Sequence, residues 1–171
     1  MEQMTMQFPE WSRVAEVELI YKTKVKPSQR PKIISSKDID SVLRQIWDAD
    51  KIEMVEEFKV LLLNRANKVL GVFEASSGGI TGTLADPRLI LAAAVKSTAV
   101  SIILSHNHPS GNLTPSKADE ELTQKIKYAA MFFDIRVLDH VIITSESYYS
   151  FADVIVVSLF YPIIFHHLST L

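Results

Sequence analysis

Residues 105–119 read Ser-His-Asn-His-Pro-Ser-Gly-Asn-Leu-Thr-Pro-Ser-Lys-Ala-Asp, and the rest of the chain is best interpreted from this stretch. The apolar run 99–104 immediately precedes this stretch. It predicts a strand buried on both faces, because apolar and polar residues barely alternate there. A helical pattern opens near Ser116 and follows it. His106 and His108 are two residues apart in an extended segment, so we expect their imidazoles to point the same way.

Asp119 follows His108 by eleven residues and falls in the first turn of the predicted helix. If the intervening loop folds back, two imidazoles and one carboxylate meet at one point. Three such protein ligands, with a fourth position left for water, are typical of catalytic zinc sites. Ser116-x-x-Asp119 is also a capping box, which requires no metal, so the pattern leaves both interpretations open.

Composition narrows the class of protein. The chain has 171 residues, a formal net charge of -2 and a pI near 6.2, which predict one main domain and give no electrostatic footprint for nucleic acid. It contains no cysteine, so any metal depends on His, Asp, Glu and water. Residues 1–10 lack the apolar segment of a signal peptide, and the apolar run 154–165 is too short to cross a bilayer as a helix. We therefore expect a cytoplasmic protein without membrane contact.

Periodicity and capping residues predict alternating helices and strands, hence an α/β or α+β fold with a central sheet flanked by helices. The turn-forming residues 64–67 predict a hairpin, and Leu89 and Phe133 are expected on the core-facing sides of their helices. The glycine-rich residues 76–83 do not form a phosphate-binding motif. The predicted strands are 14–21, 57–63, 68–75, 99–104, 135–144 and 148–151, and the predicted helices are 36–47, 86–97 and 116–133.

Several motifs together resemble the RadC branch of the JAMM (Jab/MPN) metalloprotease superfamily. They are SHNHPSG (105–111) with its continuation through Ser116-x-x-Asp119, LDHVIIT (138–144) and YYSFAD (148–153). The resemblance covers roughly residues 56–153. It implies an α/β (α+β) sandwich with a curved mixed β-sheet flanked by helices, as in cytidine deaminase-like JAMM/MPN architectures, and a mononuclear zinc site.

The resemblance also implies roles for individual residues. His106, His108 and Asp119 correspond to the ligands of one Zn²⁺ per chain, and Ser116 corresponds to a hydrogen-bond donor to the substrate oxygen or to bound water. The family's general base is a glutamate at the start of an upstream strand. Glu56 fits its Glu-x-Phe pattern, and Glu57 remains the alternative. The implied reaction is cleavage of a peptide, isopeptide or related amide bond by a metal-activated water.

The sequence departs from the family pattern at both ends. Longer RadC-like proteins carry an N-terminal helical module, and the sequence at hand starts too late to include it. The chain also changes character after Asp153, which a frameshift or a truncated reading frame would explain. We expect an extension with a first strand over 1–35, a RadC-like JAMM/MPN domain over 36–153 and an atypical apolar tail over 154–171.

Other interpretations carry less weight. The letters H-N-H do not indicate an HNH nuclease, because the namesake residues of that fold are separated across a ββα unit. We expect His140 to be a structural histidine, and His166 and His167 are not expected to bind metal. A purely structural zinc site is disfavoured, because such sites are closed by four protein ligands.

The partners are predicted only by class. A protein or peptide substrate follows from the resemblance, and the apolar tail makes a homo-oligomer possible. The alternative function is an accessory or interaction module in DNA repair or recombination, built on the same fold. The family association suggests nucleic acid, whereas the charge of the chain does not support it.

Overall fold

The computed structural model describes residues 25–78 and 85–154. The predicted strand over 14–21, part of the glycine-rich stretch and residues 155–171 of the tail lie outside these ranges. Among the described residues, no helix is both long enough and apolar enough to cross a membrane.

One mixed β-sheet forms the centre of the molecule. Its spatial order is β2-β1-β3-β4-β5. β1 pairs antiparallel with β2 and β3, β3 pairs parallel with β4, and β5 pairs antiparallel with β4. The central strand β3 is buried over its whole length, as its continuous apolar run predicts. The strands are β1 (Glu57–Leu63), β2 (Val69–Ser77), β3 (Ser101–Asn107), β4 (Arg136–Ile143) and β5 (Tyr148–Ser150).

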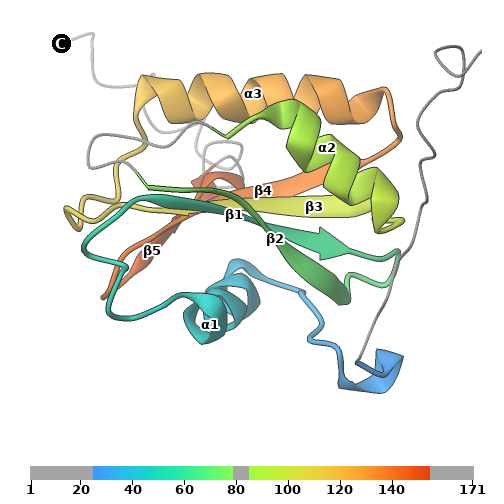
Figure 1. Ribbon diagram of the computed structural model, residues 1–171, viewed down its shortest axis with the longest axis horizontal. Coiled ribbons are helices and arrows are strands. Elements are labelled where there is room, and N and C mark those ends of the chain that lie inside the picture. The colour runs from blue at the N-terminus through green and yellow to red at the C-terminus, as the bar shows by residue number, and fades with distance from the viewer. Residues whose placement is uncertain (1–24, 79–84, 155–171) are drawn as a thin grey trace, which may run out of the picture.

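Helices cover both faces of the sheet (Figure 1). α1 (Ser36–Ile46) lies on one face, and α2 (Pro87–Lys96) and α3 (Lys117–Met131) lie on the other. A short 3-10 turn, η2 (Pro27–Gln29), precedes α1. The predicted architecture, a mixed sheet flanked by helices, is confirmed.

Strand alternation divides the buried side chains into two cores. On the α2/α3 face, Phe58 of β1 packs in the same cluster as Leu104 of β3 and Ile126 of α3. On the α1 face, Leu61 of β1 packs with Ile103 of β3 and with residues of α1. Successive residues of β3 therefore belong to different layers.

Local side-chain hydrogen bonds explain where the helices begin. Ser35 and Asp38 form a capping box at α1, and Asp86 accepts a hydrogen bond from the Arg88 N–H at α2, with Pro87 in the first turn. The predicted capping box at α3 is also present.

Two side chains predicted to face the core are exposed. Phe133 is 55% exposed, because α3 ends at Met131 and the chain reverses at Asp134, whose φ is 54°. The N–H of Ile135 then donates to the carbonyl of Ala130 (3.1 Å), a bond that closes a helix end. Leu89 is also 55% exposed, and Leu91 takes the buried position in α2.

Candidate metal centre

The structure brings His106, His108 and Asp119 together at one end of β3. Nε2 of His106 lies 2.9 Å from Nε2 of His108 and 3.3 Å from Oδ1 of Asp119. Nε2 of His108 lies 3.8 Å from Oδ2 of Asp119. Each residue offers a ligand atom, and these atoms all lie within 4.8 Å of one another, so the group could hold a metal ion.

Each of the three is positioned by its own element. His106 lies in β3 on the α2/α3 face, where its ring stacks on Phe58 at 6.0 Å between centroids. His108 follows β3, and its N–H donates to the carbonyl of Ile143 at the end of β4 (3.1 Å). Asp119 lies in the first turn of α3, which begins beyond the loop and packs over the same face.

The capping oxygen of Asp119, Oδ2, also lies nearest His108 (3.8 Å), whereas Oδ1 faces His106. Oδ2 accepts hydrogen bonds from the N–H and the hydroxyl of Ser116, both at 2.7 Å. Oδ1 is the oxygen that lies 3.3 Å from His106. The capping box and the metal site, which the sequence presents as alternatives, are therefore compatible on one carboxylate.

The donor set fits a zinc ion. Nδ1 of His108 lies 2.6 Å from the carbonyl oxygen of Asn112, which can only accept, so Nδ1 carries the proton and Nε2 keeps its lone pair. This lone pair and the Asp119 carboxylate converge with Nε2 of His106, and a cation between them relieves their repulsion. Ligand atoms at about 2.0–2.1 Å from a tetrahedral zinc would lie about 3.3 Å apart, close to the separations found.

Burial and hydrogen bonding shift the ionisation of three groups around the site. Burial opposes the ionisation of Asp119, but the hydrogen bonds from the hydroxyl and the N–H of Ser116 stabilise the carboxylate and hold its pKa below the usual range. Burial, reinforced by His106, lowers the pKa of His140, which is therefore neutral. Burial raises the pKa of Asp139, although a hydrogen bond from Ser150 offsets part of the shift.

The two candidate glutamates differ in the face they occupy. Glu57 is buried and its carboxylate pairs with Lys59 Nζ at 3.0 Å, while Lys59 lies 5.0 Å from the Trp47 ring at the end of α1. Glu57 therefore belongs to the α1 side, opposite His106. Glu56 immediately precedes β1, two residues before Phe58, so alternation assigns it to the side of His106.

Asn107, between the two histidines, is a residue whose contribution the sequence interpretation missed. Its buried side chain donates to the carbonyls of Ile52 (2.7 Å) and Val55 (2.8 Å) and accepts from the N–H of Glu57 (2.7 Å). These three bonds tie the segment that carries Glu56 to β3. Strand alternation could have indicated this role. It places Asn107 on the opposite face from His106, towards the core, where a polar side chain needs hydrogen-bond partners.

His140 also contacts the candidate metal centre. Nε2 of His140 lies 2.8 Å from Nδ1 of His106, and Nδ1 of His140 lies 2.6 Å from Oγ1 of Thr123. Both ring nitrogens thus have partners, which agrees with a structural rather than a catalytic histidine. The sequence does not predict the contact between His140 and His106, because 34 residues separate them.

Ser116 acts here as the cap of α3. Its hydroxyl donates to Oδ2 of Asp119 (2.7 Å) and accepts from the N–H of Asp119 (3.2 Å). A role as donor to a substrate oxygen stays a prediction, because it requires this hydroxyl to turn away from Asp119.

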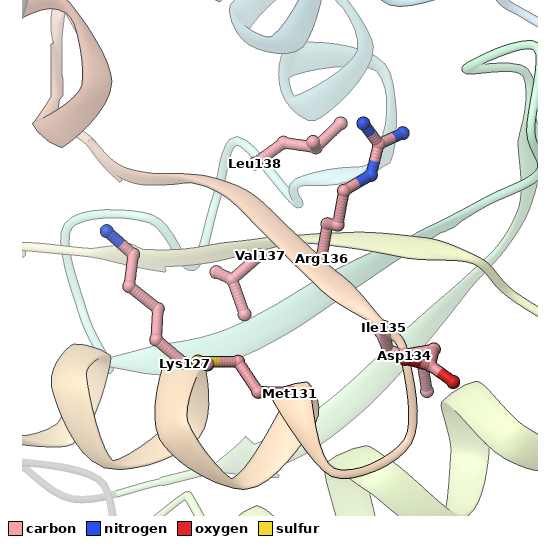
Figure 2. A pocket seen from close by; sticks show the side chains of 7 residues that line it. All are labelled: Lys127, Met131, Asp134, Ile135, Arg136, Val137 and Leu138. Atoms are coloured by element: carbon pink, nitrogen blue, oxygen red, sulfur yellow. The ribbon is translucent and has the colours of Figure 1, made fainter.

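Two hollows on the described part of the surface do not contain the three candidate ligands. A hollow of about 760 Å³ lies at the far end of α3, where Lys127 and Met131 of α3 meet Val137 and its neighbours on β4 (Figure 2). A second hollow, of about 630 Å³, runs between α3 and β5 and includes Thr123 and Phe151. The chemistry of the site is thus indicated by converging side chains rather than by cavity size.

Comparison with known proteins agrees with this geometry. The sequence pattern of the RadC-like JAB domain matches residues 33–155. A UPF0758 protein of Flavobacterium johnsoniae is 47% identical over 123 residues, which make up 71% of this chain and 52% of that protein. UPF0758 protein YfjY of Escherichia coli is 42% identical over 98 residues, which make up 57% of this chain and 61% of that protein. The chain spans about half the length of the curated relatives it matches.

Proposed function

Because the chain belongs to the RadC-like JAB domain family, we propose that it is a zinc-dependent hydrolase of amide bonds. In this proposal His106, His108 and Asp119 hold one Zn²⁺ ion. The observation that supports it is the convergence of two imidazole nitrogens and one carboxylate oxygen at the end of the central strand. The set supplies three protein ligands, which is the number found in catalytic rather than structural zinc sites.

When bound, zinc supplies a Lewis acid that lowers the pKa of a water ligand to about 7 and polarises a carbonyl group. The chain's own residues then handle the protons. Glu56 accepts the proton that the attacking water loses and delivers it to the departing amine nitrogen, as a general base and then a general acid. Its position on the His106 side of the sheet supports this assignment, whereas Glu57 is engaged by Lys59 on the other side.

Ser116 is the proposed donor to the oxyanion that develops on the substrate carbonyl. It lies at the exposed rim beside Asp119, and its backbone N–H keeps the bond to Oδ2 of Asp119 when the hydroxyl turns away. Loss of one such donor typically costs about 3–4 kcal/mol of transition-state stabilisation. The proposed substrate is a protein or peptide, with the peptide or isopeptide nature of its scissile bond left open.

Metal analysis and activity assays on the purified chain test this proposal together. We expect about one zinc per chain, hydrolysis of a peptide or isopeptide substrate, and loss of zinc in His106→Ala. Glu56→Gln should keep the metal and lose turnover, and its matched control Glu57→Gln should keep turnover in whatever fraction folds. A chain without zinc affinity contradicts the proposal. DNA binding that persists at physiological salt, without hydrolysis, would favour the accessory role instead.

A further inference from the structure

A chain of hydrogen bonds leads from the candidate metal centre into the protein. It starts at Nδ1 of His106, passes through both ring nitrogens of His140 and the hydroxyl of Thr123, and ends at the backbone carbonyl of Asp119. It therefore connects two of the three candidate ligands through side chains that do not themselves face the site. Thr123 and His140 are 1% and 0% exposed, so water does not compete for these bonds.

The carbonyl at the end of the chain fixes the direction of every bond in it. A carbonyl oxygen only accepts, so the single proton of the Thr123 hydroxyl goes to Asp119. Oγ1 of Thr123 must then accept from Nδ1 of His140. A neutral imidazole carries one proton, and His140 is neutral because it is fully buried with a histidine and a threonine, and no carboxylate, as the partners of its ring nitrogens. Its Nε2 is therefore an acceptor.

The same logic passes on to His106. Because Nε2 of His140 accepts, Nδ1 of His106 must donate. The proton of a neutral His106 is then on Nδ1, and its Nε2 keeps a lone pair. That lone pair is directed to the point where His108 and Asp119 converge.

Aromatic stacking limits rotation of both rings. Phe58 stacks on His106 with 2° between the ring planes, and Phe151 stacks on His140 at 4.9 Å with 8° between the planes. With the ring planes held, the hydrogen-bond partners of the ring nitrogens determine both the orientation of each ring within its plane and which nitrogen carries the proton.

We infer that Thr123 and His140 are positioning residues that fix His106 in the tautomer protonated on Nδ1, so that Nε2 is free to bind the metal. The tautomer is a property of the metal-free protein. Its consequence for zinc affinity rests on the proposed function. Outer partners that orient a ligating histidine in this way are typically worth 10–100-fold in metal affinity.

Nitrogen-15 NMR of the metal-free full chain tests the tautomers directly. Long-range proton–nitrogen spectra separate protonated from unprotonated ring nitrogens, and only five histidines must be assigned. We expect protonated Nδ1 on both His106 and His140. A protonated Nε2 on neutral His140 would overturn the inference, and this result needs no variant and no metal.

A matched pair of substitutions tests the consequence. Thr123→Val keeps the shape of the side chain but removes the acceptor for His140, whose proton can then move to Nε2 and drive the proton of His106 onto its own Nε2. We expect zinc affinity, measured against a competing chelator, to fall by about 10–100-fold, with the tautomer change visible by NMR. Thr123→Ser keeps the hydroxyl and should keep both the tautomers and the affinity.

The two proposals fail in different ways. If the wild-type chain binds zinc and Thr123→Val, folded by circular dichroism, matches it in affinity and tautomers, the positioning inference is wrong and the proposed function stands. If the wild-type chain does not bind zinc, the proposed function fails, and the NMR result still decides the tautomers. If Thr123→Val does not fold, the wild-type spectrum decides alone.

Discussion

Asp119 shows how one side chain can serve the start of a helix and a metal site together. Oδ2 accepts two hydrogen bonds from Ser116, and Oδ1 faces His106. The capping bonds hold the carboxylate in one rotamer before any ion arrives, which lowers the entropy lost on binding. Asp38 has the same role at α1, where its Oδ2 accepts from Ile34 and Ser35, but among the described residues it belongs to no group of potential metal ligands.

Asp119→Asn should therefore separate the two roles. The amide oxygen can still accept from Ser116, so we expect the free energy of unfolding to change by no more than about 1 kcal/mol without metal. The amide nitrogen carries no lone pair for a metal, so zinc affinity should fall by about 100-fold or more. Asp38→Asn is the matched control, because it changes the same capping position and should leave zinc affinity unchanged. Chelator competition and chemical denaturation measure the two effects.

The carboxyls of Asp119 and Asp139 should affect the pH dependence of stability in opposite directions. The fold lowers the pKa of Asp119 below its usual 3.8, so its contribution is present above that pH and is lost as the pH falls towards the folded value. The fold raises the pKa of Asp139, so its contribution is present below pH 3.8 and is lost as the pH rises through the folded value.

Denaturation of the metal-free chain between about pH 2.5 and 7 checks these signs. Relative to the wild type, Asp119→Asn should lose its stability deficit as the pH falls below 3.8. Asp139→Asn should gain on the wild type as the pH rises from the same point. Parallel curves for the wild type and either variant would contradict the corresponding shift.

At the scale of elements, Asn107 joins two segments that do not follow one another in the chain. Its side-chain amide forms hydrogen bonds with backbone groups of Ile52, Val55 and Glu57. These bonds hold the segment that precedes β1 against β3. Glu56 immediately precedes β1, and its carbonyl accepts from the N–H of Gly78 (3.2 Å), so its position depends on this join as well as on the pairing with β2.

Asn107→Asp should be severely destabilising although it is nearly isosteric. The carboxylate would face two carbonyl oxygens in a buried site, and we expect a loss of more than about 3 kcal/mol in the free energy of unfolding. Asn112→Asp is the control. Its exposed side chain only accepts a bond from the Thr114 N–H (2.9 Å), so it should stay within about 0.5 kcal/mol of the wild type. Equal losses in both variants would contradict this reading of Asn107.

The sequence predicts most of these elements because each has a local signal. Capping residues mark the starts of the helices, and the Asn64 side chain, which accepts from the N–H groups of Ala66 and Lys68, closes the predicted hairpin. The end of α3 has no such signal, because Asp134 rather than glycine adopts the left-handed conformation there. The apolar period simply continues through Phe133, so the predicted helix ran two residues too long.

In the candidate site, too, the sequence predicts the parts that have a local signal. His106, His108 and Asp119 lie within a short stretch, and their meeting follows from strand alternation and a helix start. The contacts of Asn107, Thr123 and His140 span 17 to 55 residues and depend on strand register and helix packing, which periodicity does not specify.

At the scale of the whole molecule, we expect the fold to form without a metal. Two apolar cores pack on opposite faces of the sheet, and the helix caps are complete within the protein. This differs from small zinc domains, in which the free energy of metal binding is the free energy of folding. The candidate metal centre is thus added to a structure that is already formed.

Chelation should therefore leave the secondary structure intact. We expect EDTA to leave the far-ultraviolet circular dichroism spectrum unchanged. Free zinc at 100 times its dissociation constant should add about 2.7 kcal/mol to the free energy of unfolding. Magnesium, which prefers an all-oxygen shell, serves as the control and should add nothing. Loss of the spectrum on chelation would contradict a metal-independent core.

The alternation of β3 has a consequence for how the chain tolerates insertions and deletions. His106 and Asn107 are adjacent, yet one faces Asp119 on α3 and the other faces the segment before β1. Neighbouring strands pair with β3 along both edges, so a slipped alignment would have to break two ladders. Gain or loss of a single residue within this strand would exchange imidazole and amide between the layers, so that the proposed metal site and the Asn107 contacts would be lost in one mutational step.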